Sequence, residues 1–159
     1  MAHAEEAHDA NADVRSATES ALRMLTGREH STSELKRKLT ARGHARAAVD
    51  RVVDGLVDRA LVSDRRFVEA FVHGRVERGQ GPVRIRAALR ERGVDDDLIE
   101  DAVTQSAAFW LERIERVRSK KFGARPLALD RGAWTRQARF LSQRGFPSDL
   151  IYRALGDRD

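Results

Sequence analysis

Apolar side chains recur along this chain at intervals of three and four residues, the spacing that places them on one face of an α-helix. The stripes predict helices over about residues 16–28, 46–60, 132–143 and 148–155, and further helices that begin near residues 32, 64, 82, 96 and 106. The predicted core positions of the helix over 46–60 are Val49, Val52, Val53, Leu56 and Val57. We therefore expect an all-α fold.

Residues that favour helix ends stand where these stripes begin. Ser31 with Glu34, and Ser16 with Glu19, have the spacing of a capping box, in which two side chains bond to free amide groups of the first turn. Pro82 suits a first helical position, because the N–H that proline lacks has no partner there. Further cap candidates are Ser63 or Asp64, and Asp95, and we place a break before the next helix near Gln105 or Ser106.

An Arg-Gly pair recurs three times, at intervals of 50 and 52 residues. The pairs are Arg42-Gly43, Arg92-Gly93 and Arg144-Gly145, and a leucine stands four residues before each glycine. A glycine after a helical stripe is typical of the left-handed residue that ends a helix. The chain is thus predicted to fold as three tandem three-helix repeats, over residues 16–62, 63–105 and 106–156, in an elongated, curved, right-handed-type array. Residues 1–15, with four acidic residues and one arginine, are predicted to form a disordered acidic tail.

The composition agrees with a helical protein of about one domain. Of the 159 residues, 35% are charged and only 6% are aromatic. The chain has no cysteine, which excludes disulfides and thiolate zinc sites. It also lacks a run of apolar residues long enough for a membrane span, and its polar N-terminus does not resemble a secretion signal. We therefore expect a cytoplasmic protein without membrane contact.

The net charge of +5 is unevenly distributed, with twelve basic and six acidic residues over 107–159. One basic stretch contains Arg75, Arg78, Arg84, Arg86, Arg90 and Arg92, against only Glu77 and Glu91. A second candidate patch contains Lys120 and Lys121 with Arg116, Arg118 and Arg125. Either patch could be a solvated surface in which long side chains shield apolar neighbours, or a binding face for carboxylates or phosphates.

The sequence offers no catalytic, cofactor or metal site. The turn GQGP, from Gly79 to Pro82, lacks the third glycine of a dinucleotide fingerprint, since Arg84 stands there, and lacks the Gly-Lys-Ser/Thr ending of a P-loop. It therefore reads as a turn followed by a helix start. The five histidines have no metal-ligand spacing, and no nucleophile and base can be paired by spacing. We expect a protein without enzymatic activity or cofactor.

Four motifs in order resemble the RecX family of bacterial recombination regulators. They are D-x-x-F from Asp64, G-x-G-P-x-R-I from Gly79, L-x-x-x-G-V from Leu89, and R-F-L-x-x-R-G-F from Arg139. The resemblance covers about residues 16–156, and it departs from the family at Val68, where alanine is usual.

The resemblance implies three three-helix repeats that bind within the groove of the RecA filament on DNA. It further implies inhibition of filament growth, strand exchange, ATP hydrolysis and the co-protease role in the SOS response. We expect a monomer whose contacts with the filament include Arg75, Arg78, Arg84, Arg86, Arg90, Lys120 and Lys121. The alternatives are a helical regulator that binds DNA directly and a general helical scaffold. Weak nonspecific DNA contact is compatible with the filament role.

Overall fold

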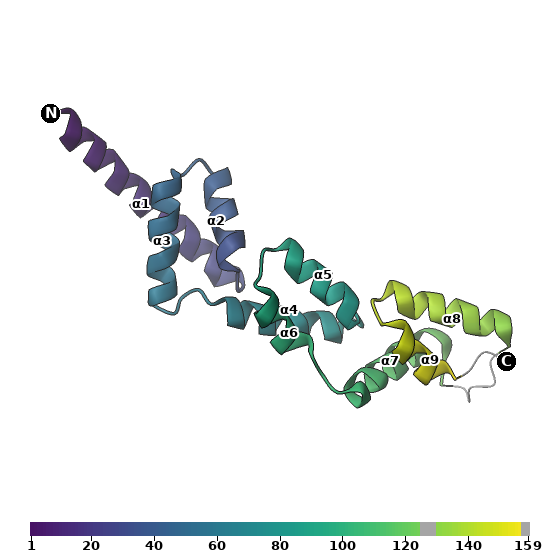
Figure 1. Ribbon diagram of the computed structural model, residues 1–159. Coiled ribbons are helices and arrows are strands. Elements are labelled where there is room, and N and C mark those ends of the chain that lie inside the picture. Colours follow the sequence, from purple (N-terminus) through teal and green to yellow (C-terminus); the bar gives the residue numbers. More distant parts are fainter. Residues whose placement is uncertain (125–129, 157–159) are drawn as a thin grey trace. The chain divides into compact units, whose positions relative to one another are not determined.

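The computed structural model describes residues 1–124 and 130–156, and these ranges contain nine helices and no strand (Figure 1). The helices are α1 (Ala2–Gly27), α2 (Thr32–Ala41), α3 (Arg46–Asp58), α4 (Asp64–Glu77), α5 (Pro82–Glu91), α6 (Asp96–Val103), α7 (Ala107–Phe122), α8 (Arg131–Gln143) and α9 (Ser148–Leu155). The predicted all-α fold of three tandem three-helix repeats is confirmed, with α1–α3, α4–α6 and α7–α9 as the repeats. The residues at which one repeat ends and the next begins stay a prediction.

The chain divides into two compact units. The first comprises Met1–Ala70 with Arg92–Val94, and the second comprises Phe71–Glu91 with Asp95–Asp159. In the first unit α1, α2 and α3 pack on one another. In the second unit α5 packs on α6, and α7, α8 and α9 pack together.

The core of the first unit lies between α1, α2 and α3. Its buried residues are Ala17, Ala21, Leu35, Leu39, Val49, Val52, Val53, Leu56 and Val62. The predicted core position Val57 is wrong, because its side chain is 43% exposed. Val57 lies in the last turn of α3, one residue before the helix ends, and on the edge of the buried face.

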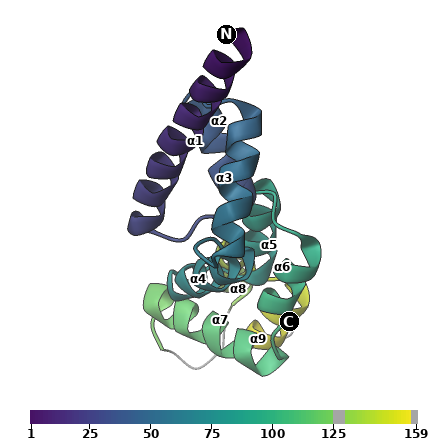
Figure 2. The same ribbon diagram turned by 90° about the vertical axis from the view of Figure 1, so that its left-hand side faces the viewer.

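Helix α1 begins at Ala2, so the predicted helix start at Ser16 is wrong and the residues predicted as a disordered tail lie within a helix. Five alanines among residues 2–12 favour this extension, since alanine is the strongest helix former. The first turns of α1 extend past α2 and α3 in both views (Figures 1 and 2). Asp13 bonds to the His44 ring nitrogen Nδ1 at 2.6 Å and accepts the Ala45 N–H at 2.9 Å, which fixes α1 against the start of α3.

Several predicted caps are confirmed by their hydrogen bonds. Ser31 Oγ accepts the N–H of Glu34 at 3.1 Å, and Asp95 caps α6. At the predicted break near Gln105 or Ser106, the structure shows that Ser106 caps α7. The capping box at Ser31 is only half formed, because the Glu34 carboxylate binds the Arg28 guanidinium instead of the backbone. At α4 the cap is Ser63, and Asp64 accepts from the N–H and hydroxyl of Thr32 at 2.8 and 3.1 Å.

The three Arg-Gly pairs lie at corresponding helix ends, after α2, α5 and α8, and the glycines have φ of +93°, +71° and +94°. Two of these turns contact the start of the middle helix of the preceding repeat. The turn after α5 contacts the start of α2, and the turn after α8 contacts the start of α5. In the first unit the hydroxyls of Ser31 and Ser33 donate to the carbonyls of Arg92 and Gly93 at 3.5 and 3.4 Å. The same kind of contact recurs in the second unit, where backbone N–H groups are donors.

At this second contact, the C-terminal turn of α8 bonds to the N-terminal turn of α5. Gly81 N–H donates to the Arg144 carbonyl at 2.7 Å, and Val83 N–H donates to the Gly145 carbonyl at 2.9 Å. Free amides at a helix start thus meet free carbonyls at a helix end, so the positive end of the α5 dipole lies against the negative end of the α8 dipole. A Cβ at Gly81 would lie 2.5 Å from the Gly145 carbonyl, so only glycine permits this approach.

The apolar core of the second unit contains two tryptophans, Trp110 and Trp134. Its fully buried residues include Ile85, Leu89, Ile99, Val103, Ile114 and Leu141. Trp110 packs edge-on against Phe146 with ring centroids 6.4 Å apart. The Trp134 ring packs against the Tyr152 ring at a tilt of 47°, with centroids 5.0 Å apart, and its indole N–H donates to the Gly156 carbonyl at 3.1 Å. This core positions α7 and α8, which carry most of the candidate site.

Candidate interaction site

Two of the predicted contact arginines on α5 are held by carboxylates of α6. Arg86 donates two hydrogen bonds to Glu100 at 2.8 and 3.0 Å, and this pairing holds the pKa of Glu100 below its ordinary value. Arg90 donates to Asp96 at 2.9 Å, and this hydrogen bond raises the pKa of Arg90 above its ordinary value. These ion pairs join α5 to α6 and reduce the charge that either arginine presents to a partner.

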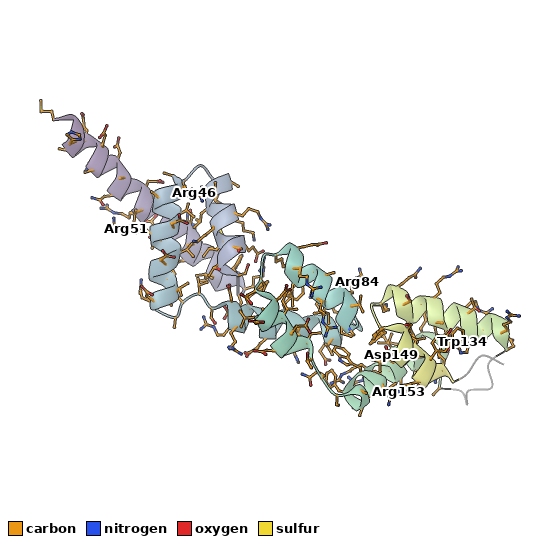
Figure 3. The ribbon with its side chains drawn as sticks, in the orientation of Figure 1. Arg46, Arg51, Arg84, Trp134, Asp149 and Arg153 are labelled. Carbon is orange, nitrogen blue, oxygen red and sulfur yellow. The ribbon has the colours of Figure 1, made fainter. Side chains whose placement is uncertain are left out.

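The other arginines of this stretch have different surroundings. The Arg75 guanidinium lies over the Phe71 ring, 4.7 Å from its centroid. Arg84 is exposed on α5 and donates to the Gln143 carbonyl at 3.4 Å (Figure 3). Arg78 is exposed just after α4, where its carbonyl accepts from the Arg144 guanidinium at 3.2 Å. The stretch therefore does not form one continuous basic face.

The structure instead brings Arg78 together with the lysines of the second predicted patch. The end of α4, the outer side of α7 and the end of α8 enclose a concavity of about 390 Å³, which we call the basic pocket. Its basic lining residues are Arg78, Arg113, Arg116, Lys120, Lys121 and Arg144, and the only acidic one is Glu77. Val76, Gly79, Val117 and Phe140 complete the lining.

A glycine turn and an arginine set the shape of the basic pocket. Gly79 has a φ of +80°, which ends α4 in a conformation that L side chains rarely adopt. A Cβ there would also lie 2.9 Å from Cγ2 of Val117, so glycine lets the turn approach α7. On the opposite side Arg144 lies over the Phe140 ring, 5.3 Å from its centroid, and bonds to the Arg78 carbonyl. The guanidinium of Arg144 is therefore held by two contacts.

The positive charge of the basic pocket is poorly compensated. Arg113 and Arg116 lie 3.8 and 3.7 Å from the Glu112 carboxylate, at the outer limit of an ion pair. Arg113 Nε is buried and has no hydrogen-bond acceptor in the described part of the chain. Lys120 and Lys121 are exposed in the last turn of α7, and neither forms an ion pair with any described residue. The pocket thus carries several cations without a carboxylate partner of their own.

Two residues of the second predicted patch do not join the pocket. Arg118 is only 3% exposed and donates to the Glu115 carboxylate at 2.9 and 2.7 Å, which lowers the pKa of Glu115. It is therefore a structural residue, and its predicted place in the patch is wrong. Arg125 lies outside the described residues.

Sequence reasoning missed two members of the pocket, Arg113 and Arg144. Arg113, Arg116 and Lys120 are spaced at i, i+3 and i+7, so their common helix face could have been found from the sequence. Arg144 belongs to the third Arg-Gly pair, and only the folded chain brings it to Arg78. The GQGP turn is not an anion site, because the N–H groups of Gly81 and Val83 are occupied by carbonyls of the α8 turn.

The described residues do not form a metal site or a membrane-spanning helix. Over residues 1–124 and 130–156, no three acidic or histidine side chains gather in a way that would hold a metal ion. In the same ranges, each helix is too short or too polar to cross a bilayer. The basic pocket is consequently the candidate site that the described residues support best.

Comparisons with known proteins agree on one family. Protein-family models described as the first, second and third three-helix domains of RecX match residues 17–56, 63–103 and 111–155, in that order. A curated relative from Halorhodospira halophila, named "Regulatory protein RecX", is 42% identical over 95% of this chain and 93% of its own length. A relative of the same name from Pseudomonas savastanoi pv. phaseolicola is 41% identical over 87% of this chain and 88% of its own length.

Solved structures show the same fold. The crystal structure of RecX from Lactobacillus salivarius aligns with a TM-score of 0.78 at 20% identity, over 91% of this chain and 96% of the other. A second structure, titled as a regulatory protein RecX, aligns with a TM-score of 0.80 at 21% identity, over 98% of this chain and 77% of the other.

Proposed function

The chain belongs to the RecX family of regulatory proteins, and we propose that it binds the RecA filament on DNA and inhibits its recombinase, ATPase and co-protease activities. The observation that carries this proposal is the ordered match of all three family domains along the chain. Its relatives are named regulatory proteins rather than enzymes. In this proposal the protein acts by binding alone and needs no cofactor. It acts as a monomer in the bacterial cytoplasm, during DNA repair and the SOS response.

The physical mechanism rests on several linked contacts. Each three-helix repeat offers a surface that can meet a different filament subunit, and contacts joined in one chain form at high effective concentration once the first has formed. A chain bound in this way restrains the relative movement of the subunits that it bridges. The exposed cations Arg78, Arg84, Lys120 and Lys121 are the proposed charged contacts of this surface. Arg86 and Arg90 are secondary candidates, because binding would have to replace their ion pairs with α6.

The proposal is tested by the ATPase activity of RecA on single-stranded DNA during a titration with this protein. We expect inhibition at ratios well below one molecule per RecA subunit, because one bound molecule restrains a neighbourhood of the filament. Light scattering of the isolated protein tests the proposed monomer. Absence of inhibition at any ratio would reject the proposed function.

Direct DNA binding is the second candidate function, and the basic pocket is the observation that favours it. This function predicts inhibition only when free DNA is saturated by the protein. It also predicts an affinity for naked DNA that falls steeply with added salt, since phosphate neutralisation releases counterions. The ATPase titration therefore separates the two candidates.

A further inference from the structure

Several positive charges of the basic pocket have no carboxylate partner among the described residues. It has six basic residues and one acidic residue in its lining, whereas the whole chain has a net charge of only +5. Clustered cations of this kind repel one another and cost stability unless an anionic partner joins them. Arg86 and Arg118 show the contrasting situation, since each bonds twice to a carboxylate of its own unit. The pocket therefore has the charge of a site for an acidic partner.

Two guanidinium groups of the pocket are held in place before any partner binds. Arg144 lies over Phe140 and bonds to the Arg78 carbonyl, and Arg113 lies over Phe109 at 4.8 Å from the ring centroid. A guanidinium fixed in this way loses little conformational entropy when it binds a carboxylate. The exposed Lys120 and Lys121 add mobile charge at the rim.

The remaining lining is apolar and favours a peptide over a nucleic acid strand. Val117, which is only partly buried, offers contact to an aliphatic side chain. Proteins that bind single strands stack bases on aromatic rings along an extended groove. Here the Phe140 ring is covered by Arg144 and contacts the Phe122 ring edge-on at 5.3 Å, so it does not offer a free stacking face. A concavity of about 390 Å³ also suits a short segment better than a continuous strand.

The geometry points to the basic pocket as a docking site for an acidic protein segment that carries an apolar side chain between its carboxylates. The carboxylates pair with Arg113, Arg144 and the rim lysines, and the apolar side chain contacts Val117. We assign this segment to the filament protein, RecA, and this assignment rests on the proposed function above. The preference of the pocket for an acidic segment does not depend on that function.

Binding of a labelled peptide to the full chain tests this inference by fluorescence anisotropy. The probe is a short synthetic peptide in which leucine alternates with pairs of aspartate and glutamate, and a labelled oligothymidine serves as the competing ligand class. The double variant Lys120→Glu with Lys121→Glu should bind the peptide at least about tenfold more weakly, because two attractive charges become repulsive. A Lys→Gln pair at the same positions should give a smaller loss.

The matched control is Arg46→Glu with Arg51→Glu, which reverses two exposed charges on α3 in the other unit (Figure 3). This control should bind the peptide within about twofold of the unchanged protein, since its net charge equals that of the lysine variant. Equal weakening of both double variants would show a general charge effect and overturn the inference. No measurable peptide binding, or oligothymidine binding that alone depends on the lysines, would also overturn it.

The ATPase titration distinguishes failure of this inference from failure of the proposed function. Loss of peptide binding and of RecA inhibition in the lysine variant supports the whole assignment. Full inhibition by a lysine variant that no longer binds peptide overturns the assignment of the pocket to the filament. Peptide binding by a protein that never inhibits RecA supports the chemistry of the pocket and rejects the proposed function.

Discussion

The close approach of two backbones at Gly81 predicts a strongly destabilising substitution, Gly81→Ala. The added Cβ would lie 2.5 Å from the carbonyl carbon and oxygen of Gly145 and 2.6 Å from the Phe146 nitrogen, whereas ordinary contacts begin at 3.4 Å. The turn after α8 and the start of α5 must therefore separate by about 0.9 Å. All three neighbours are backbone atoms, so no side-chain rotation can relieve the overlap.

The cost follows from the hydrogen bonds that this separation breaks. Two N–H groups, of Gly81 and Val83, lose carbonyl acceptors now at 2.7 and 2.9 Å. Each lost bond costs roughly 1 kcal/mol net, and more where the donor stays buried. Looser packing nearby adds a similar amount, and the reduced entropy of the unfolded chain offsets about 0.5 kcal/mol. The expected loss in the free energy of unfolding is about 2–3 kcal/mol.

The control is Gly74→Ala in the middle of α4. A Cβ at Gly74 has no neighbour within 4 Å, and the residue is helical. Alanine should therefore stabilise the protein by about 0.5–1 kcal/mol. The same chemical change at two glycines is thus predicted to have opposite signs.

Urea denaturation measures both variants with two signals. Both tryptophans of the chain, Trp110 and Trp134, belong to the second unit, so their fluorescence reports on the unit that contains Gly81. Circular dichroism at 222 nm reports on helices of both units. A Gly81→Ala protein with the unfolding midpoint of the unchanged protein would refute the proposed contact between α5 and the α8 turn.

Further predictions concern stability. Burial of the Glu34 carboxyl opposes its ionisation, but the hydrogen bond and charge of Arg28 outweigh this and lower its pKa to about 2. Ionised Glu34 therefore stabilises the folded chain above its ordinary pKa of 4.5, and this contribution is lost as the pH falls toward 2. Glu34→Gln should lower the free energy of unfolding by about 2 kcal/mol at pH 7, a value that allows for solvent screening of the half-exposed Arg28. In acid-denaturation curves, the difference in stability between the variant and the unchanged protein should vanish as the pH falls toward 2. A difference that stays constant with pH would contradict the ion pair. Arg86→Ala should cost only about 0.5–1 kcal/mol in urea, because its pair with Glu100 is partly exposed, and a larger loss would mean that the pair is effectively buried. Ile114→Ala removes a fully buried side chain and should cost about 2–5 kcal/mol by fluorescence-monitored unfolding; a cost below about 1 kcal/mol would place Ile114 outside the core.

The helix boundaries could be predicted because local chemistry sets them. Ser31, Asp95 and Ser106 cap helices through their own side chains, and Gly43, Gly93 and Gly145 end helices through a conformation that glycine favours. The start of α1 was missed for the same local reason. Ser16 and Glu19 have the spacing of a capping box, but the preceding alanines continue the helix, and a serine that the helix passes through cannot cap it.

The candidate site could be predicted only in part. The charge of Lys120 and Lys121 was visible in the sequence, but the pairing of Arg86 with Glu100 depends on how α5 packs on α6. A run of arginines does not reveal which members have carboxylates opposite them. The inclusion of Arg144 with Arg78 likewise needs the fold, because 66 residues separate them.

The glycines of the three Arg-Gly pairs all end a helix in a left-handed conformation, but they differ in how closely other residues approach them. At Gly43 an added Cβ would meet nothing within 4 Å, so glycine there serves only the left-handed end of α2. At Gly145 the Cβ would lie 2.4 Å from the Cβ of Arg84 and 2.7 Å from its nitrogen, so the same glycine also permits the contact with α5. That contact fixes the turn from which Arg144 reaches the Arg78 carbonyl. The close approach of two backbones therefore also fixes the position of Arg144 in the basic pocket.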